Sequence, residues 1–147
     1  ACGLVAAGLA AAPDPLTELR SHTPSSPAQL TAAVVTDLAA AADGVQRWAA
    51  AQPLPADSPA AILASIDRLL DVQSQVNQML ERVFAMRVQF ASLPADDDRH
   101  QRLRLYLRLT SQMIDLSGRL HTALREAIEV AANRLEVLGT KGQRQGS

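Results

Sequence analysis

The sequence has few aromatic residues, one cysteine and no long apolar run. Aromatic residues make up only 3% of the 147 positions. The single cysteine, Cys2, excludes an internal disulfide and any zinc site built from several cysteines. No apolar stretch approaches the roughly 20 residues needed to cross a bilayer, so we expect no membrane span. The formal net charge of −1 provides no overall field that would attract nucleic acid or an anionic membrane.

Motifs for catalysis and cofactor binding are also missing. The sequence contains no Gly-x-Ser-x-Gly, no His-Glu-x-x-His and no glycine-rich phosphate loop after a strand. His100 and His121 are too far apart on one predicted helix, about 30 Å, to share a metal. Asp96, Asp97 and Asp98 would point in different directions on a helix, so we interpret them as carboxylates at the positive end of the helix dipole. We therefore expect no enzymatic activity and no resident cofactor or metal.

The sequence instead contains two long helical patterns. Ser58 and Pro59 are typical of a helix cap and first position. The apolar residues that follow form a heptad seam typical of coiled coils: Ile62, Leu69, Val72, Val76, Met79, Val83, Met86, Phe90 and Leu93. After Pro94 a second apolar stripe follows the helical period: Tyr106, Leu109, Met113, Leu116, Leu120, Leu124, Ala127, Ala131, Leu135 and Leu138.

The segment from Leu93 to Ala95 is too short for a loop of any length, so we expect the two helices to fold back as an antiparallel hairpin. We expect the second helix to end at Gly139, a plausible C-cap, and to project beyond the first by about ten residues. Its projecting end would include Ile128, Val130, Ala131, Leu135 and Leu138, which would face water unless something covers them.

A third helix is predicted before the hairpin. Ser26, Pro27 and Gln29 form a capping box, and the apolar stripe that follows contains Leu30, Val34, Leu38, Ala41, Val45 and Trp48. Pro53 ends this helix near Gln52. Asp14 is a plausible cap for a shorter helix over residues 16–20.

Together these patterns predict an all-α fold. We expect an elongated up-down-up three-helix bundle over 27–51, 59–92 and 95–138, built on the long antiparallel helical hairpin, with a short N-terminal helical segment. We divide the chain into an N-terminal apolar segment and loop (1–25), the helical bundle (26–139) and a flexible tail (140–147), which has no apolar residue.

The apolar run 1–12 has three interpretations. It is a short buried helix, the remnant of a secretory signal peptide, or a segment that starts with a lipidated Cys2. The localisation therefore stays open between the cytoplasm and, if 1–12 is a signal remnant, the bacterial envelope or the exterior.

Two sets of surface residues are candidates for binding. Trp48, Ile128, Leu135 and Leu138 form a possible apolar interaction surface. Basic residues gather around Tyr106, but the neighbouring aspartates offset their charge and the helical spacing divides them between two sides, which argues against nucleic acid as the partner: Arg99, Arg102, Arg104 and Arg108.

These features favour a non-enzymatic helical-bundle module for protein–protein interaction or scaffolding, whose partner is a second copy of itself or an adjoining domain. Two alternatives remain. The chain, which starts with Ala1 rather than methionine, is the helical segment of a larger enzyme or envelope protein whose active site lies outside it. Otherwise the bundle binds a small apolar ligand or a metal between its helices, near the small side chains of Thr110, Ser117 and Gly118.

Overall fold

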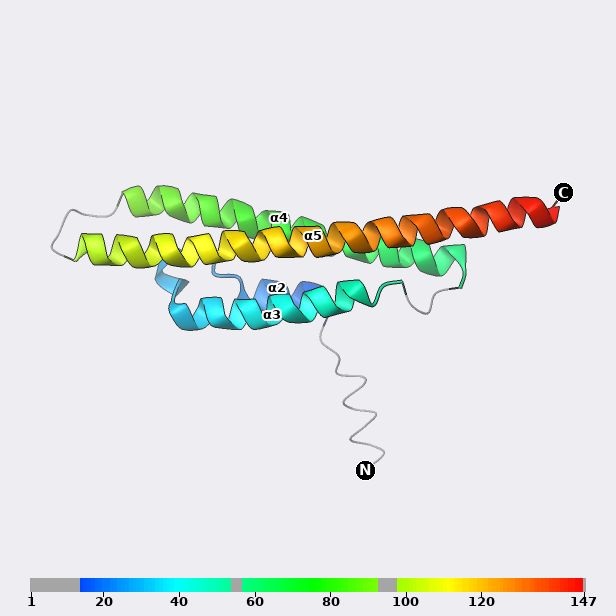
Figure 1. Ribbon diagram of the computed structural model, residues 1–147. Helices are drawn as coiled ribbons and strands as arrows, with labels where there is room; N and C mark the ends of the chain where they lie inside the picture. The colour runs from blue at the N-terminus through cyan, green and yellow to red at the C-terminus, as the bar shows by residue number, and fades with distance from the viewer. Residues whose placement is uncertain (1–13, 54–56, 93–97, 147) are drawn as a thin grey trace, which may run out of the picture.

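A computed structural model describes residues 14–53, 57–92 and 98–146, with the side chains of the last helix described as far as residue 140. The expected all-α bundle is confirmed. Its elements follow in the order α2 (Pro15–His22), a short 3₁₀ helix η1 (Pro27–Gln29), α3 (Ala32–Ala50), α4 (Pro59–Ala91) and α5 (Arg99–Gly146). In Figure 1, α3, α4 and α5 run alternately in opposite directions, and α2 and α3 lie together on one side of the α4–α5 hairpin. The apolar segment 1–12 lies outside the described residues.

The predicted heptad seam is the core of the hairpin. All its described members on α4, from Ile62 to Phe90, are at most 2% exposed. On α5 the predicted stripe is buried from Leu109 to Ala131. Leu93, the last predicted member on the first helix, lies outside the described residues. Because the side chains of these two rows exclude water along about 40 Å of helix, burial of apolar surface is the main force that closes the hairpin. We refer to this pair of rows as the inner seam.

Specific side-chain contacts at both ends hold the register of the hairpin. Phe90 stacks on Tyr106 with a ring-centroid distance of 4.2 Å. Arg87 donates from Nε to the hydroxyl of Thr110 (3.1 Å) and from Nη2 to that of Ser111 (2.8 Å). At the other end, Arg134 pairs with Asp57 at 3.2 Å. These contacts confirm that the helices are antiparallel and place Gln75 in the middle of α4 opposite His121 in the middle of α5.

The short helix α2 packs against α3 and α4, and it changes the environment of Gln75. Asp14 caps α2 by accepting from the N–H of Leu16 (3.1 Å), as predicted, and its carboxylate also pairs with Arg68 of α4. The heptad pattern places Gln75 on the face of α4 opposite the seam and so predicts that it faces solvent, but this prediction is wrong, since only 2% of it is exposed. Its side-chain oxygen accepts a hydrogen bond from Nε of Arg20 on α2 (3.0 Å), and this bond satisfies the amide oxygen in a buried position.

The predicted start of the third helix is wrong. Ser26 makes no side-chain cap bond, and residues 27–29 form only the 3₁₀ turn η1. Gln29 instead accepts from the backbone and hydroxyl of Ser25, each at 2.9 Å. The α-helix begins after Thr31, whose hydroxyl accepts from the N–H of Val34 (3.2 Å). Thr31 directly precedes the alanines and valines of the first helical turn and is therefore the N-cap, whereas Ser26 lies five residues earlier in the chain.

The core face of α3 is shifted by one residue from the predicted stripe at several positions. The buried residues of α3 are Val35, Leu38, Ala42, Val45 and Ala49. The predicted members Val34, Ala41 and Trp48 are only partly buried. The reason is that α3 has two neighbours: α5 covers one side of its apolar face and α2 the other. Because the side of α3 that faces α5 and the side that faces α2 are both apolar, one predicted stripe cannot describe the buried residues of both sides.

The last helix continues past its predicted end. Gly139 does not terminate α5, which extends to Gly146. The flexibility assigned to residues 140–147 remains a prediction. Ala131 is fully buried and Ile128 packs against the core, so these residues do not overhang as expected. The part of α5 that projects beyond α4 instead begins after Arg134, which pairs with Asp57, and near Leu138. It is visible at the C-terminal end of the helix in Figure 1.

Candidate functional site

The hairpin leaves a second row of apolar side chains on α4 in contact with solvent. Four large apolar residues of this helix are about half exposed or more: Leu63 (50%), Leu70 (46%), Phe84 (51%) and Val88 (70%). Between them lie the partly exposed Ile66, Gln73, Leu80 and Arg87 and the exposed Asn77. Since positions three and four apart share one side of a helix, these residues form one continuous stripe beside the inner seam.

A matching row lies on α5. Leu107 is 43% exposed. Four more residues follow at intervals of seven and are all partly exposed: Ile114, His121, Ile128 and Leu135. We call the stripe on α4 (Leu63, Ile66, Leu70, Gln73, Asn77, Leu80, Phe84, Arg87 and Val88) together with this row on α5 the outer face.

The outer face points away from α2 and α3. On α4, Gln73 and Asn77 are two residues from Gln75, the residue that bonds to α2, and two helical steps reverse the direction of a side chain. On α5, His121 stands in the same relation to Ala123, which lines a groove with the end of α3. Ile114 lies at the edge of the outer face, since it also borders a groove that includes Gln46 of α3. Among the described residues, no helix covers this side of the hairpin (Figure 1).

The residues predicted as an interaction surface do not come together. Ile128 and Leu135 belong to the α5 row of the outer face, and Leu138 follows near the projecting end. Trp48 lies elsewhere, in a groove between α3 and α2. Of the predicted basic residues, Arg104 and Arg108 are exposed, whereas Arg99 and Arg102 are partly buried, which agrees with their division between two sides of the helix.

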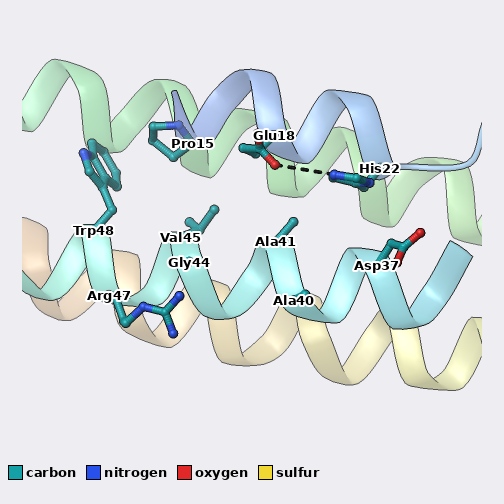
Figure 2. A pocket seen from close by; sticks show the side chains of 10 residues that line it. All are labelled: Pro15, Glu18, His22, Asp37, Ala40, Ala41, Gly44, Val45, Arg47 and Trp48. Atoms are coloured by element: carbon teal, nitrogen blue, oxygen red, sulfur yellow. Dashed lines mark ion pairs between the residues drawn. The ribbon is translucent and has the colours of Figure 1, made fainter. Parts of the chain in front are cut away.

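The groove between α2 and α3 has a volume of about 530 Å³. Figure 2 shows Trp48 and Pro15 at one end and Asp37 at the other, with the small residues Ala40, Ala41 and Gly44 along α3. Glu18 and His22, one turn apart on α2, form an ion pair at 3.4 Å from Oε2 to Nε2 if the imidazole is protonated. The groove therefore has apolar walls with charged groups at its edge.

Glu18 and His22 alone do not make this groove a catalytic site. A carboxylate that orients a histidine is part of many catalytic sites, but such a site also needs a nucleophile within reach of the imidazole. None of the described residues that line this groove is a serine, threonine or cysteine. The nearby hydroxyls of Ser21 and Thr23 donate to the carbonyls of Thr17 and Leu19 in their own helix.

The region around Thr110, Ser117 and Gly118 is packed rather than hollow where the structure describes it. Thr110 is fully buried, and its hydroxyl donates to the Tyr106 carbonyl (2.8 Å) and accepts from Arg87. The Ser117 hydroxyl donates to the Met113 carbonyl (2.9 Å). Gly118 borders an open surface groove. These hydroxyls serve the helices themselves and leave no polar group directed into an interior cavity.

No cluster of three or more histidine, cysteine, aspartate or glutamate side chains is placed to hold a metal ion in the part of the chain that the structure describes. None of the described helices combines the length and the apolar character needed to cross a membrane.

The predictions from the sequence missed the outer face, although a signal for it is present. Apolar doublets recur at multiples of seven residues along α4, as Ile62-Leu63, Leu69-Leu70 and Val83-Phe84. The first member of each doublet is buried in the inner seam, and the second is exposed on the outer face. A helix with two adjacent apolar stripes has more apolar surface than one antiparallel neighbour can cover.

Comparison with known proteins adds no assignment. No protein-family model, no curated protein and no solved structure matches this chain.

Proposed function

We propose that this chain is a non-enzymatic helical-bundle module that acts by protein–protein contact, and that the outer face is its contact surface. The observation that supports this proposal is the exposure of Leu63, Leu70, Phe84 and Val88 in a single stripe on α4. Isolated exposed apolar residues are common on any protein, but a contiguous apolar patch is typical of an interaction site.

The rim of the outer face has the polar character that interfaces usually have. Asp67 and Glu81 lie exposed beside the apolar stripe on α4, and Arg125 lies exposed beside the row on α5. Apolar residues flanked by charged residues at the edge of the face are usual in a non-obligate protein interface. The proposal moves the contact surface from the projecting end of α5, where the sequence suggested it, to the flank of the hairpin.

The ligand-binding alternative has less support. The groove beside Trp48 is large enough for a small molecule, since ligand pockets hold about 300–1,000 Å³. However, its charged groups do not converge on one point, since Glu18 and His22 pair with each other and Asp37 lies at one end (Figure 2).

Site-specific photo-crosslinking tests the proposal. A photoreactive phenylalanine analogue is introduced at Phe84, and as a matched control at Val130, which is 56% exposed on another side of α5. In cells of the organism from which the gene derives, we expect discrete crosslinked products from position 84 and none from position 130. Products from both positions alike, or from neither, would contradict a specific role for the outer face.

A further inference from the structure

The outer face has an internal symmetry that identifies a partner. On α5 its row consists of Leu107, Ile114, His121, Ile128 and Leu135, which is the same sequence of residue types in either direction from His121. An interface between two identical chains related by a two-fold axis must be complementary to itself in this way, because each residue meets the mirror position of its partner.

The stripe on α4 is also self-complementary about Gln75, except for Val88, whose counterpart Ile62 is buried in the inner seam. Reversal about Gln75 brings Leu70 opposite Leu80, Ile66 opposite Phe84, and Gln73 opposite Asn77. Apolar positions thus meet apolar positions, and the two amides at the centre meet each other. At the far end Leu63 meets Arg87, whose guanidinium is held by Thr110 and Ser111 and whose stem is apolar.

The two midpoints lie at the same level along the hairpin. Phe90 stacks on Tyr106, and Gln75 and His121 are each 15 residues from that contact along their own helices, so they lie opposite each other. One two-fold axis perpendicular to the helices can therefore satisfy both rows together. If only one of the two rows were symmetric, its midpoint would not need to lie level with the midpoint of the other helix.

From these observations we infer that the outer face binds the outer face of a second copy of this chain, α4 against α4 and α5 against α5, antiparallel, with the axis at Gln75 and His121. The inference rests on the proposed function and names its partner.

The available area is sufficient for a stable dimer. From Leu63 to Val88 the stripe is about 38 Å long, and the hairpin is about 20 Å wide, or two helix diameters. Two such faces would bury roughly 1,500 Å² in total, within the range of about 1,200–2,000 Å² that is usual for specific protein interfaces.

The polar residues at the centre fit the same arrangement. Neither Gln73, Asn77 nor His121 makes a side-chain hydrogen bond to any other described residue. An amide carries both donors and an acceptor, so Gln73 of one copy and Asn77 of the other can bond reciprocally on each side of the axis. A polar layer of this kind typically fixes the register of paired helices.

Disulfide trapping tests the position of the axis in the full chain with Cys2→Ser, which removes the only native thiol. Only a residue at the axis meets its own copy, so we expect His121→Cys to form a covalent dimer rapidly on mild oxidation. Arg125→Cys, exposed one turn further along α5, is the matched control. It lies about 12 Å along the helix from its copy, beyond the roughly 7 Å between Cα atoms that a disulfide spans. Equal dimer formation by both variants, or by neither, would overturn the inferred geometry.

Analytical ultracentrifugation of the purified wild type provides the second measurement. We expect a concentration-dependent dimer, which Phe84→Lys weakens at least tenfold while circular dichroism shows an unchanged helix content. At the rim, Asp67 of one copy lies about 3 Å along the helix axis from the level of Glu81 of the other, with like charge, so Glu81→Lys should tighten the dimer about fivefold through two new ion pairs. A wild type that stays monomeric at all concentrations overturns self-association.

Ultracentrifugation and crosslinking together distinguish self-association from contact with a different protein. A monomer in solution whose position 84 still crosslinks to a different protein in cells removes the second copy as partner and leaves the contact surface in place. A monomer that crosslinks to nothing removes both.

Discussion

The inner seam and the outer face of the hairpin follow the same seven-residue spacing on the same two helices, yet one is closed and the other is open. The inner seam contains only apolar side chains on α4, and the two buried hydroxyls beside its α5 row, those of Thr110 and Ser117, bond to carbonyls of their own helix. The outer face has two amides and an imidazole at its centre. Amides buried without partners cost roughly 1–3 kcal/mol each, so the stripe with Gln73 and Asn77 is the one that stays outside in a single chain.

The difference shows that apolar spacing determines which residues can form a seam, and that polar residues determine which seam closes first. A seam with no unsatisfied polar group closes within one chain. A seam with a central polar layer closes without loss only where a complementary polar layer meets it.

The largest test of this comparison uses two neighbouring leucines. Leu69 is 0% exposed in the inner seam and Leu70 is 46% exposed on the outer face. We expect Leu69→Ala to lower the free energy of unfolding by about 3 kcal/mol through lost burial and a residual cavity. Leu70→Ala should lower it by less than about 1 kcal/mol in dilute protein. Urea denaturation followed by circular dichroism measures both, and similar losses would show that the two stripes are not distinct.

A smaller effect is expected at the boundary between the two faces. Arg87→Met keeps the apolar stem but removes the hydrogen bonds to Thr110 and Ser111. We expect a loss of about 1 kcal/mol in the same denaturation experiment, since partly exposed charged hydrogen bonds are weakened by solvent. Arg82→Met is the control, because Arg82 is exposed and makes no side-chain bond to a described residue. A loss as large in the control would remove Arg87 as a register contact.

The smallest expected effect is a gain. Apart from the adjacent residues and the backbone of its own helix, a methyl group added at Gly118 meets no atom within 4 Å, and the same is true at Gly139. Gly118→Ala should stabilise the fold by up to about 1 kcal/mol, because alanine favours the helix and Gly118 lies in the part of α5 that packs on α4. Gly139→Ala should have almost no effect, since the projecting end does not need to be helical for the core to form. A thermal melt of each variant distinguishes these outcomes.

Much of this architecture is predictable from the sequence, because strong local signals specify it. The cap at Ser58, which accepts from the N–H of Ala61 at 3.2 Å, and the seam from Ile62 to Phe90 agree with their predictions. The predicted start of the third helix fails because two potential caps, Ser26 and Thr31, lie close together, and local patterns do not rank them. The burial of Gln75 depends on Arg20, 55 residues earlier, and such a long-range contact leaves no periodic signal.

The candidate site was less predictable than the fold. The greater length of the second helix predicts that Ile128 and Leu135 are available for contact. In the structure they belong to the outer face because of their position around α5, not because of its length. The α4 half of that face is not predicted, because a single apolar stripe per helix leaves the second residue of each doublet in solvent. Only the contacts of α2 and α3 show which side of the hairpin they leave free.

The position of Trp48 has a practical consequence. It is the only tryptophan in the sequence, and it lies beside Pro15 where α2 rests on α3 (Figure 2). Its fluorescence emission should therefore report the detachment of α2 from the bundle, while far-ultraviolet spectroscopy is dominated by the two long helices, which contain no tryptophan. The native chain thus contains two independent signals, and the order in which they change on heating would show whether the short helix unfolds together with the hairpin or before it.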